Sequence, residues 1–287
     1  MIQKITEEGY PKILCCKTLQ VSRSGYYAWL GRPKVKINKS EFRLKSRMKS
    51  LFNESRESLG SRTLMESLRA EGFTVGRRKV RYLMRSLNLQ VKQRIRYRLK
   101  RADNDPPKYA PNLVKMNFDP VSKNKIWVGD ITYLKTLDGW YYLSVVMDLY
   151  SRRILGWDYS KTMTTDLVER SLQQAYTLRN CPKKVVFHSD RGSQYSSNQL
   201  KKFLMERGFI QSMGSTGACW DNAVIERFFG SLKHDWLYKQ KLLSSEAMKS
   251  DIAAYMKYYN LKRLHSYNGN MSPVDYENYK VKVSTAA

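Results

Sequence analysis

The pattern of apolar and polar residues changes along the chain, from a helical period in the first third to strand-like runs beyond residue 120. Residues 13–30 predict two short helices, with Ser22 or Ser24 as the cap of the second. The pair fits a small helix-turn-helix, and it fits a helical hairpin packed on a neighbour equally well. A basic stretch, residues 31–40, then has the composition of a linker.

A clearer helical period covers residues 41–90. Residues 58–73 predict one helix, ended by Gly72, and residues 76–89 predict the next. The apolar stripe of the second helix consists of Val80, Leu83, Met84 and Leu87. Another face carries Arg78, Arg81 and Arg85. A helix pair with a basic second helix favours helix-turn-helix binding in a DNA major groove, and the alternative is a three-helix core with a solvated arginine face.

Residues 91–101 contain no acid and place a basic residue at every second position or so, namely Lys92, Arg94, Arg96, Arg98 and Lys100. In an extended conformation these side chains would form a basic rail. Prolines at 106, 107 and 111 then interrupt regular structure. We therefore expect four parts: a short helical segment (1–35), a helical DNA-binding region (36–100), a linker (101–120) and a larger domain (121–287).

The larger domain mixes strand and helix patterns. Three strands in succession, joined by short turns, predict an antiparallel meander, and helices alternating with strands follow. The predicted strands are 126–134, 141–150, 152–160, 183–190 and 209–213, and the predicted helices are 165–178, 196–208 and 222–238. This order predicts an α/β fold with an open, mixed five-stranded sheet covered by helices on both faces.

Composition narrows the class of partner. The chain has 287 residues, of which 42% are hydrophobic and 12% aromatic, enough for a sizeable core. Its 52 basic residues against 25 acidic ones give a formal charge of +27, which attracts polyanions. Residues 1–110 hold 27 of the basic and only 9 of the acidic residues. We therefore expect the protein to bind nucleic acid, and we expect residues 1–110 to make most of the contacts with it.

Neither a membrane segment nor a metal-binding cysteine pattern is evident. No run approaches the ~18 apolar residues of a membrane span, and the first ten residues contain no signal-peptide core. The four cysteines show no C-x-x-C spacing, so we expect reduced thiols rather than a zinc site. We expect a soluble, cytoplasmic protein associated with the nucleoid.

Three acidic residues occupy positions that suit chemistry. Asp130 lies within a predicted strand, where a buried carboxylate needs a cation beside it. Asp190 ends a strand and opens a loop, and Glu226 lies on a predicted helix beside its apolar stripe. Each has a plainer explanation: a salt bridge for Asp130, a turn cap before Gly192 for Asp190, and solvation for Glu226.

Carboxylates that converge from different elements can hold a pair of Mg²⁺ ions roughly 3.5 to 4 Å apart, the arrangement used in phosphodiester chemistry. Lys233 lies two helical turns beyond Glu226 and is placed to reach a DNA backbone. His188 is expected to be a packed, hydrogen-bonded residue, Asp148 a structural partner of Arg152 or Arg153, and Asn222 a helix cap.

The same residues carry a family resemblance over nearly the whole chain. Asp130, Asp190 and Glu226, with 35 residues between the last two, resemble the D, D-35-E triad of transposases and retroviral integrases. The fuller strings resemble the second-frame DDE transposase of the bacterial "insertion sequence three" family, namely VGDITYL, HSDRGSQYSS, DNAVIERFFGSLK and SPVDYE. The resemblance implies an RNase H-like core that binds two Mg²⁺ or Mn²⁺ ions through the triad.

It also implies metal-dependent cleavage at element ends, followed by attack of the freed 3′-OH on another phosphodiester. The implied partners are double-stranded DNA of element ends and target, a homo-oligomer on DNA, and an upstream-frame protein. The alternatives are a DNA-binding regulator without catalysis and a hydrolytic nuclease on the same core. Candidate DNA-binding residues are Lys233, Arg78, Arg81, Arg85, Arg94, Arg96 and Arg98.

Overall fold

The computed structural model describes residues 2–31, 39–91, 109–115, 117–214 and 222–285. The chain divides into two compact units, residues 1–46 and residues 47–287. The predicted basic rail, with Arg94, Arg96 and Arg98, lies outside the described residues, as do residues 101–108 and 116 of the predicted linker. The first unit has an apolar cluster of its own, which contains Ile2, Cys15, Cys16 and Tyr26.

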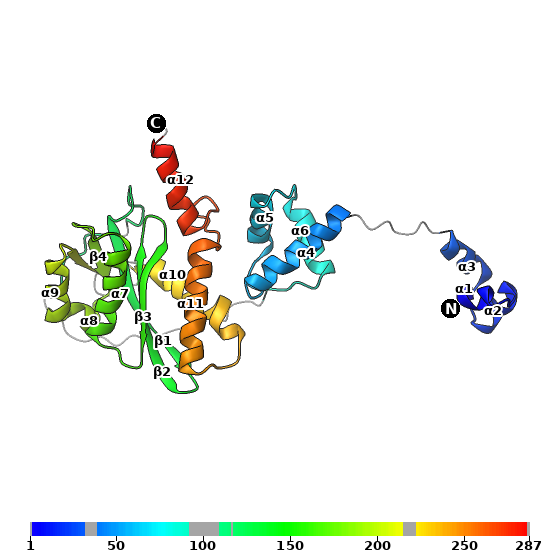
Figure 1. Ribbon diagram of the computed structural model, residues 1–287, viewed down its shortest axis with the longest axis horizontal. Coiled ribbons are helices and arrows are strands. Elements are labelled where there is room, and N and C mark those ends of the chain that lie inside the picture. The colour runs from blue at the N-terminus through cyan, green and yellow to red at the C-terminus, as the bar shows by residue number, and fades with distance from the viewer. Residues whose placement is uncertain (1, 32–38, 92–108, 116, 215–221, 286–287) are drawn as a thin grey trace. The chain divides into compact units, whose positions relative to one another are not determined.

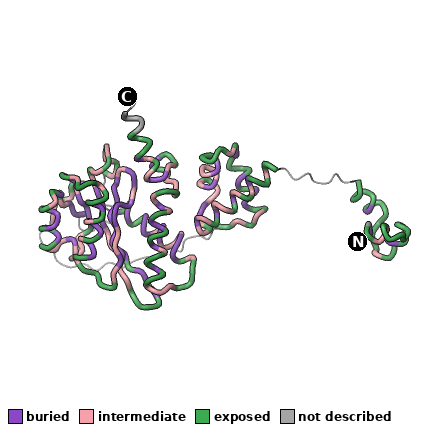
Figure 2. The backbone as a smooth tube through the Cα atoms, in the orientation of Figure 1, coloured by how far each residue is buried: buried purple, intermediate pink, exposed green. Residues whose placement is uncertain are grey.

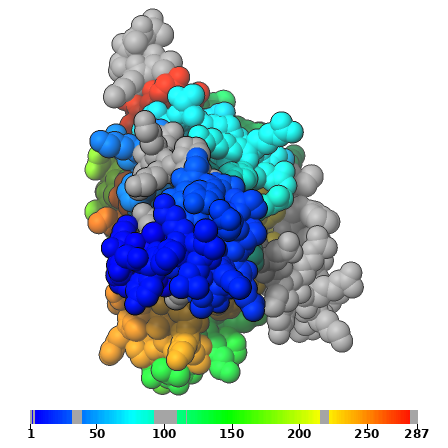
Figure 3. Space-filling model, turned by 90° about the vertical axis from the view of Figure 1, so that its right-hand side faces the viewer, coloured from blue at the N-terminus to red at the C-terminus, as the bar shows by residue number. Residues whose placement is uncertain are grey.

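The first unit is helical. Its helices are α1 (Ile2–Glu7), α2 (Lys12–Thr18) and α3 (Arg23–Leu30), followed by the start of α4 (Lys39–Glu54). Ser22 caps α3 by accepting a hydrogen bond from the Gly25 amide at 3.1 Å, so one of the two expected caps is confirmed. The unit's surface is blue in Figure 3, and it exposes large apolar side chains, among them Tyr10, Ile13, Tyr27 and Trp29.

The second unit begins with the rest of α4, then α5 (Ser61–Ala70) and α6 (Arg77–Ser86). Gly72 follows α5 with φ +87, a conformation that favours glycine and ends the helix as predicted. The apolar stripe of α6 is buried at Val80, Leu83 and Met84 and half-buried at Leu87. The helical period therefore located the buried face of α6 correctly.

A five-stranded mixed sheet forms the centre of the second unit, as the strand pattern predicts. Its strands are β1 (Ile126–Thr136), β2 (Gly139–Asp148), β3 (Arg153–Ser160), β4 (Val186–Ser189) and β5 (Ile210–Met213). The order across the sheet is β3-β2-β1-β4-β5. The first three strands pair antiparallel, and β1 pairs parallel with β4. Alternating side chains therefore project from two faces, and both faces need a cover.

Helices cover both faces of the sheet (Figure 1). One face packs against α7 (Thr165–Leu178), α8 (Ser193–Ser196) and α9 (Asn198–Glu206) through a cluster that includes Trp127 and Phe187. The other packs against α10 (Ala223–Ser231) and α11 (Ser245–Leu261) through a cluster that includes Val128. In Figure 2 the buried backbone accordingly follows the strands.

The predicted helix 222–238 is found as an unbroken helical run, but it does not keep one helix type to its end. The α-helix ends at Ser231, and a π-helical turn (Leu232–Trp236) and a 3₁₀ turn (Leu237–Lys239) follow. A π turn inserts extra backbone and rotates the side chains after it. It leaves Trp236 buried, with its indole N–H donating to Asp251 at 3.2 Å. Asn222 occupies the N-cap position of α10, as predicted, but its side chain makes no capping hydrogen bond.

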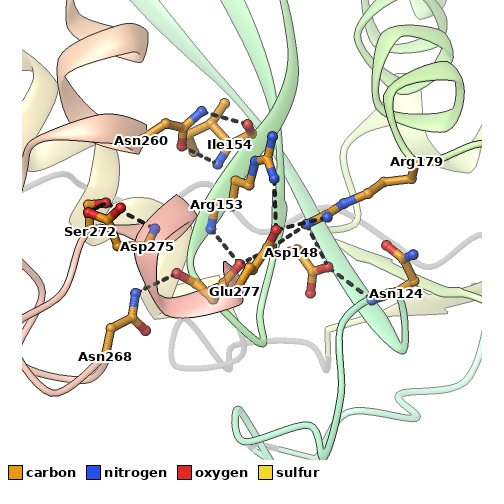
Figure 4. Close-up of polar contacts among 11 residues, drawn as sticks. Asn124, Asp148, Arg153, Ile154, Arg179, Asn260, Asn268, Ser272, Asp275 and Glu277 are labelled. Atoms are coloured by element: carbon orange, nitrogen blue, oxygen red, sulfur yellow. Dashed lines mark hydrogen bonds and ion pairs between the residues drawn. The ribbon is translucent and has the colours of Figure 1, made fainter. Parts of the chain in front are cut away.

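The carboxy-terminal helix α12 (Pro273–Thr285) is fixed to the core by a buried polar network (Figure 4). Glu277 accepts hydrogen bonds from Arg153 and from Arg179 at 2.7 and 3.0 Å. Asp148 pairs with Arg179 at 3.4 Å, rather than with Arg152 or Arg153 as expected. Burial raises the pKa of Asp148 to about 6. The network joins three segments that are distant along the chain.

Candidate active site

Asp130 lies on the central strand, on the face of the sheet that α10 covers. Val128 packs into the cluster beneath α10, and Asp130 shares its face because side chains alternate along a strand. In the parallel pairing, Val128 lies opposite His188. Continuing the same register by two residues carries Asp130 to the level of Asp190. The fold therefore brings the two aspartates to adjacent positions.

Asp190 follows the last residue of β4 and begins the loop that leads to α8. Its Oδ1 atom accepts a hydrogen bond from the Gly192 amide at 3.0 Å, as expected for a turn-forming aspartate. The residue is exposed, yet partial burial of the carboxyl raises its pKa. The hydrogen bond fixes one oxygen of the carboxyl in the loop.

Glu226 lies in the first turn of α10 and is exposed. The helix is held by apolar neighbours in its sequence: Ile225, Phe228 and Phe229 are all buried in the cluster against the sheet. Because α10 packs on the face that carries Asp130, this anchoring directs the edge with Glu226 toward the aspartates. Glu226 therefore comes from a helix, α10, that is distant along the chain from Asp130 and follows Asp190 by 36 positions.

The electrostatics of Asp130 connect the three acids. Burial raises the pKa of Asp130 well above its usual value, and the negative charges of Asp190 and Glu226 raise it further. A hydrogen bond from the Ile131 amide at 2.8 Å and the charge of Lys233 act in the opposite direction. Each acid makes ionisation of Asp130 more costly, and a cation among them would relieve that cost.

Lys233 belongs to the same environment. Its ammonium lies 4.7 Å from the centroid of the Tyr133 ring, a cation–π contact. Burial lowers the pKa of Lys233, while the charge of Asp130 raises it. Tyr133 was not singled out from the sequence, because an exposed aromatic residue on a strand gave no signal. The π turn carries Lys233 to the level of this strand residue.

Neighbouring residues support the site without contributing metal ligands. His188 is fully buried and its Nδ1 lies 2.9 Å from Ser212 Oγ, which confirms the packed histidine expected from the sequence. Tyr195 is also buried, and burial first, then the charges of Asp130 and Asp190, raise its pKa. Its side chain is only 2% exposed and packs in the apolar cluster with Phe187.

Within the described ranges, no three His, Cys, Asp or Glu side chains gather closely enough to hold a metal ion. The charges of Asp190 and Glu226 nevertheless both raise the pKa of Asp130. Catalytic groups commonly tighten only when substrate binds, so this spacing does not conflict with a joint role.

The predicted DNA-binding arginines of α6 are solvent-facing. Arg78, Arg81 and Arg85 are all exposed, on the side of the helix away from its buried stripe. The arginine face remains available to an external polyanion.

Among the helices that the structure describes, none has the length and apolar character needed to cross a bilayer.

Comparisons with known proteins follow the same division of the chain. Family models described as "Integrase core domain" match residues 120–219 and 207–273. A model described as "HTH-like domain" matches residues 39–97. The integrase match covers the sheet with Asp130 and Asp190, and its second part covers Glu226.

Two relatives are similar over almost their full length. The transposase InsF for insertion sequence IS3A of Escherichia coli (strain K12) is 36% identical over 268 residues, covering 92% of each chain. The insertion element IS600 uncharacterized 31 kDa protein of Shigella sonnei is 35% identical over 259 residues, covering 90% of this chain and 95% of the relative. Among solved structures, the HTLV-2 integrase catalytic core in complex with magnesium is 21% identical, with a TM-score of 0.41, over 51% of this chain and 92% of that one.

Proposed function

Because the chain belongs to the insertion sequence three family of DNA transposases, we propose that Asp130, Asp190 and Glu226 together form its catalytic site. The chain is a polynucleotidyl transferase that acts at insertion-sequence ends. The observation that carries the triad is the packing: the β1–β4 register brings Asp130 level with Asp190, and the helix that bears Glu226 packs on the same face of the sheet. The raised pKa of Asp130, to which both other acids contribute after burial, agrees with this arrangement.

The three acids suit divalent cations. Carboxylate oxygens are the donors that Mg²⁺ and Mn²⁺ prefer, and the repulsion within this group favours a cation as its counter-charge. Two such ions, when bound, activate an attacking oxygen and stabilise a leaving one. We assign Asp130, Asp190 and Glu226 as the ligands, with side-chain movement of Glu226 completing the set.

Other residues of the chain position the reacting strand. Lys233, held against Tyr133 beside Asp130, is placed to contact a phosphate of that strand. The Gly192 amide donates a hydrogen bond to Oδ1 of Asp190 and so orients the carboxyl. Oδ2 is the oxygen that we assign to metal binding. Cleavage by water and then attack by a DNA 3′-OH both take place at phosphorus, so no protein nucleophile is needed.

We further propose how the chain is organised and what it binds. Residues 36–100, the helix-turn-helix region, bind double-stranded DNA of the element end, and residues 121–287 perform catalysis on end and target DNA. Two element ends must be joined, which favours a homo-oligomer assembled on DNA and association with the nucleoid. An upstream-frame protein is a further proposed partner.

Incubation of the purified protein with labelled element-end DNA and Mg²⁺ tests this function. We expect nicked and joined products, and we expect neither after chelation of the metal. Nicking without joining would favour a hydrolytic nuclease. Binding without either product, at any Mg²⁺ or Mn²⁺ concentration, would favour a regulator and reject the proposed catalysis.

The arginine face of α6 yields a separate prediction. Replacing Arg78, Arg81 and Arg85 together by Gln removes three potential phosphate contacts. The slope of log affinity against log salt is then expected to become shallower by about 2.7, since each contact with duplex DNA contributes about 0.9. Anisotropy titrations over a range of salt measure the slope. Replacing three exposed lysines of α9 and α11 (Lys201, Lys202 and Lys249) by Gln is the matched control, and an equal change there would reject the assignment.

A further inference from the structure

A second basic site lies on another side of α10. A cavity of about 840 Å³ is lined by five arginines and one acid, namely Arg62, Arg77, Arg152, Arg227, Arg263 and Glu66. We call it the arginine cleft. Ala223, Val224 and Arg227 of α10 contribute to its wall. Because a helix is only about 10 Å across with its side chains, the cleft lies close to Glu226 on the same helix.

The acids near the cleft do not neutralise its charge. Glu66 is the acid in the lining, and its carboxylate lies 3.7 Å from the guanidinium of Arg69, a residue that does not line the cleft. Arg152 and Arg263 have acidic neighbours at 3.8 and 3.5 Å, Asp119 and Asp235, while Arg62, Arg77 and Arg227 are exposed. The site thus has an excess of guanidinium groups, which bind phosphate through paired N–H donors.

Arg152 shows most directly that this cleft suits an anion. It is 8% exposed, and its Nη1 is buried with no hydrogen-bond acceptor among the described residues. A buried guanidinium N–H without an acceptor is costly. Burial lowers the pKa of Arg152. The pKa of His265, which also lines the cleft, is lowered to about 3, first by burial and then by the positive charges of the surrounding arginines Arg263, Arg152 and Arg227. An incoming phosphate would relieve both effects.

The walls add flat apolar surfaces. The guanidinium of Arg152 lies 3.8 Å from the centroid of the Tyr267 ring, and Phe118 and Phe228 also line the cleft. Arginine and aromatic side chains side by side form the platforms on which unpaired bases stack. A cavity of this volume holds roughly one or two nucleotides, by comparison with ligand sites of about 300–1,000 Å³, and is too small for a duplex.

We infer that the arginine cleft binds a short unpaired segment of DNA next to the active site, through its phosphates and bases. The inference rests on the transposase function proposed above and adds a site for the strand that is displaced when an end is opened. The other side of α10 presents Glu226 toward Asp130, so one helix separates the unpaired segment from the reacting phosphate.

The test compares two fluorescent probes in the presence of a chelator: a blunt duplex, and the same duplex with a short unpaired thymidine tail. The full chain is expected to bind the tailed probe more tightly. Arg227→Gln should reduce that advantage roughly ten-fold, the effect of losing one charge-assisted hydrogen bond, while blunt-probe affinity is retained. Arg62→Gln, on the opposite wall, should act in the same direction.

Arg170→Gln is the matched control, because Arg170 is an exposed arginine of α7, on the opposite face of the sheet. It should leave the tail advantage unchanged. Absence of a tail advantage in the unaltered protein, or equal weakening of both probes by Arg227→Gln, would overturn the cleft. Asp190→Asn protein should keep the advantage, so failure of catalysis and failure of the cleft are distinguishable.

Discussion

Replacing Asp190 by Asn is expected to lower the rates of end nicking and joining by about a thousand-fold or more. The substitution removes one charged ligand from the proposed metal site, and metal stabilisation of the transition state is worth several kcal/mol. The introduced amide side chain keeps an oxygen that can accept the Gly192 hydrogen bond, so the loop should retain its geometry. Gel assays with labelled end DNA measure both rates.

Two further measurements separate loss of chemistry from loss of structure. End binding should be unchanged, and thermal stability without metal should not fall, because the charge of Asp190 opposes ionisation of Asp130. Asp166→Asn is the matched control: Asp166 is an exposed acid on α7 that accepts a hydrogen bond from Gln199. Joining by Asp190→Asn protein within ten-fold of the unaltered rate would exclude the triad as the catalytic site.

Replacing Glu277 by Ala is expected to lower the free energy of unfolding by about 3–5 kcal/mol, as for other buried ion pairs that lose one partner. Glu277 is 5% exposed and accepts hydrogen bonds from Ser151 and from two arginines. Its removal would leave Arg153 and Arg179 without their main acceptor. Urea unfolding measures the change. Glu206→Ala, at an exposed surface pair, should change stability by less than about 0.5 kcal/mol.

The same network predicts a pH dependence. Burial alone would raise the pKa of Glu277, but Arg179, Ser151 and Arg153 outweigh it and hold the pKa below 4.5. A carboxyl whose pKa is lowered by folding stabilises the fold above its unfolded value and loses that contribution as pH falls through the folded value. The stability difference between the unaltered protein and Glu277→Gln should therefore be full at neutral pH and shrink below 4.5. A difference that grew on acidification would contradict this.

Much of the architecture could be predicted from local patterns. The five strands, α7 and the buried stripe of α6 follow from side-chain periods of 2 and 3.6, which depend only on neighbouring residues. The helical run predicted over 222–238 is present, but its change to a π turn after Ser231 was not predicted, because that change depends on where Trp236 can be buried. That location is set by Asp251 and the surface of α11, which lie outside any local window.

The candidate site divides in the same way. The sequence by itself determined that Asp130 lies on a strand, that Asp190 ends one, that Glu226 lies beside an apolar stripe, and that the chain attracts polyanions, because these properties depend on spacing and charge. Only the pairing of β1 with β4 brought the two aspartates to the same level of the sheet. Only the tertiary structure decided the contacts of Lys233 with Tyr133 and of Arg179 with Glu277, 98 residues away, and the grouping of arginines in the cleft. Such contacts follow from how elements pack across the whole core, and packing couples residues that no local pattern connects.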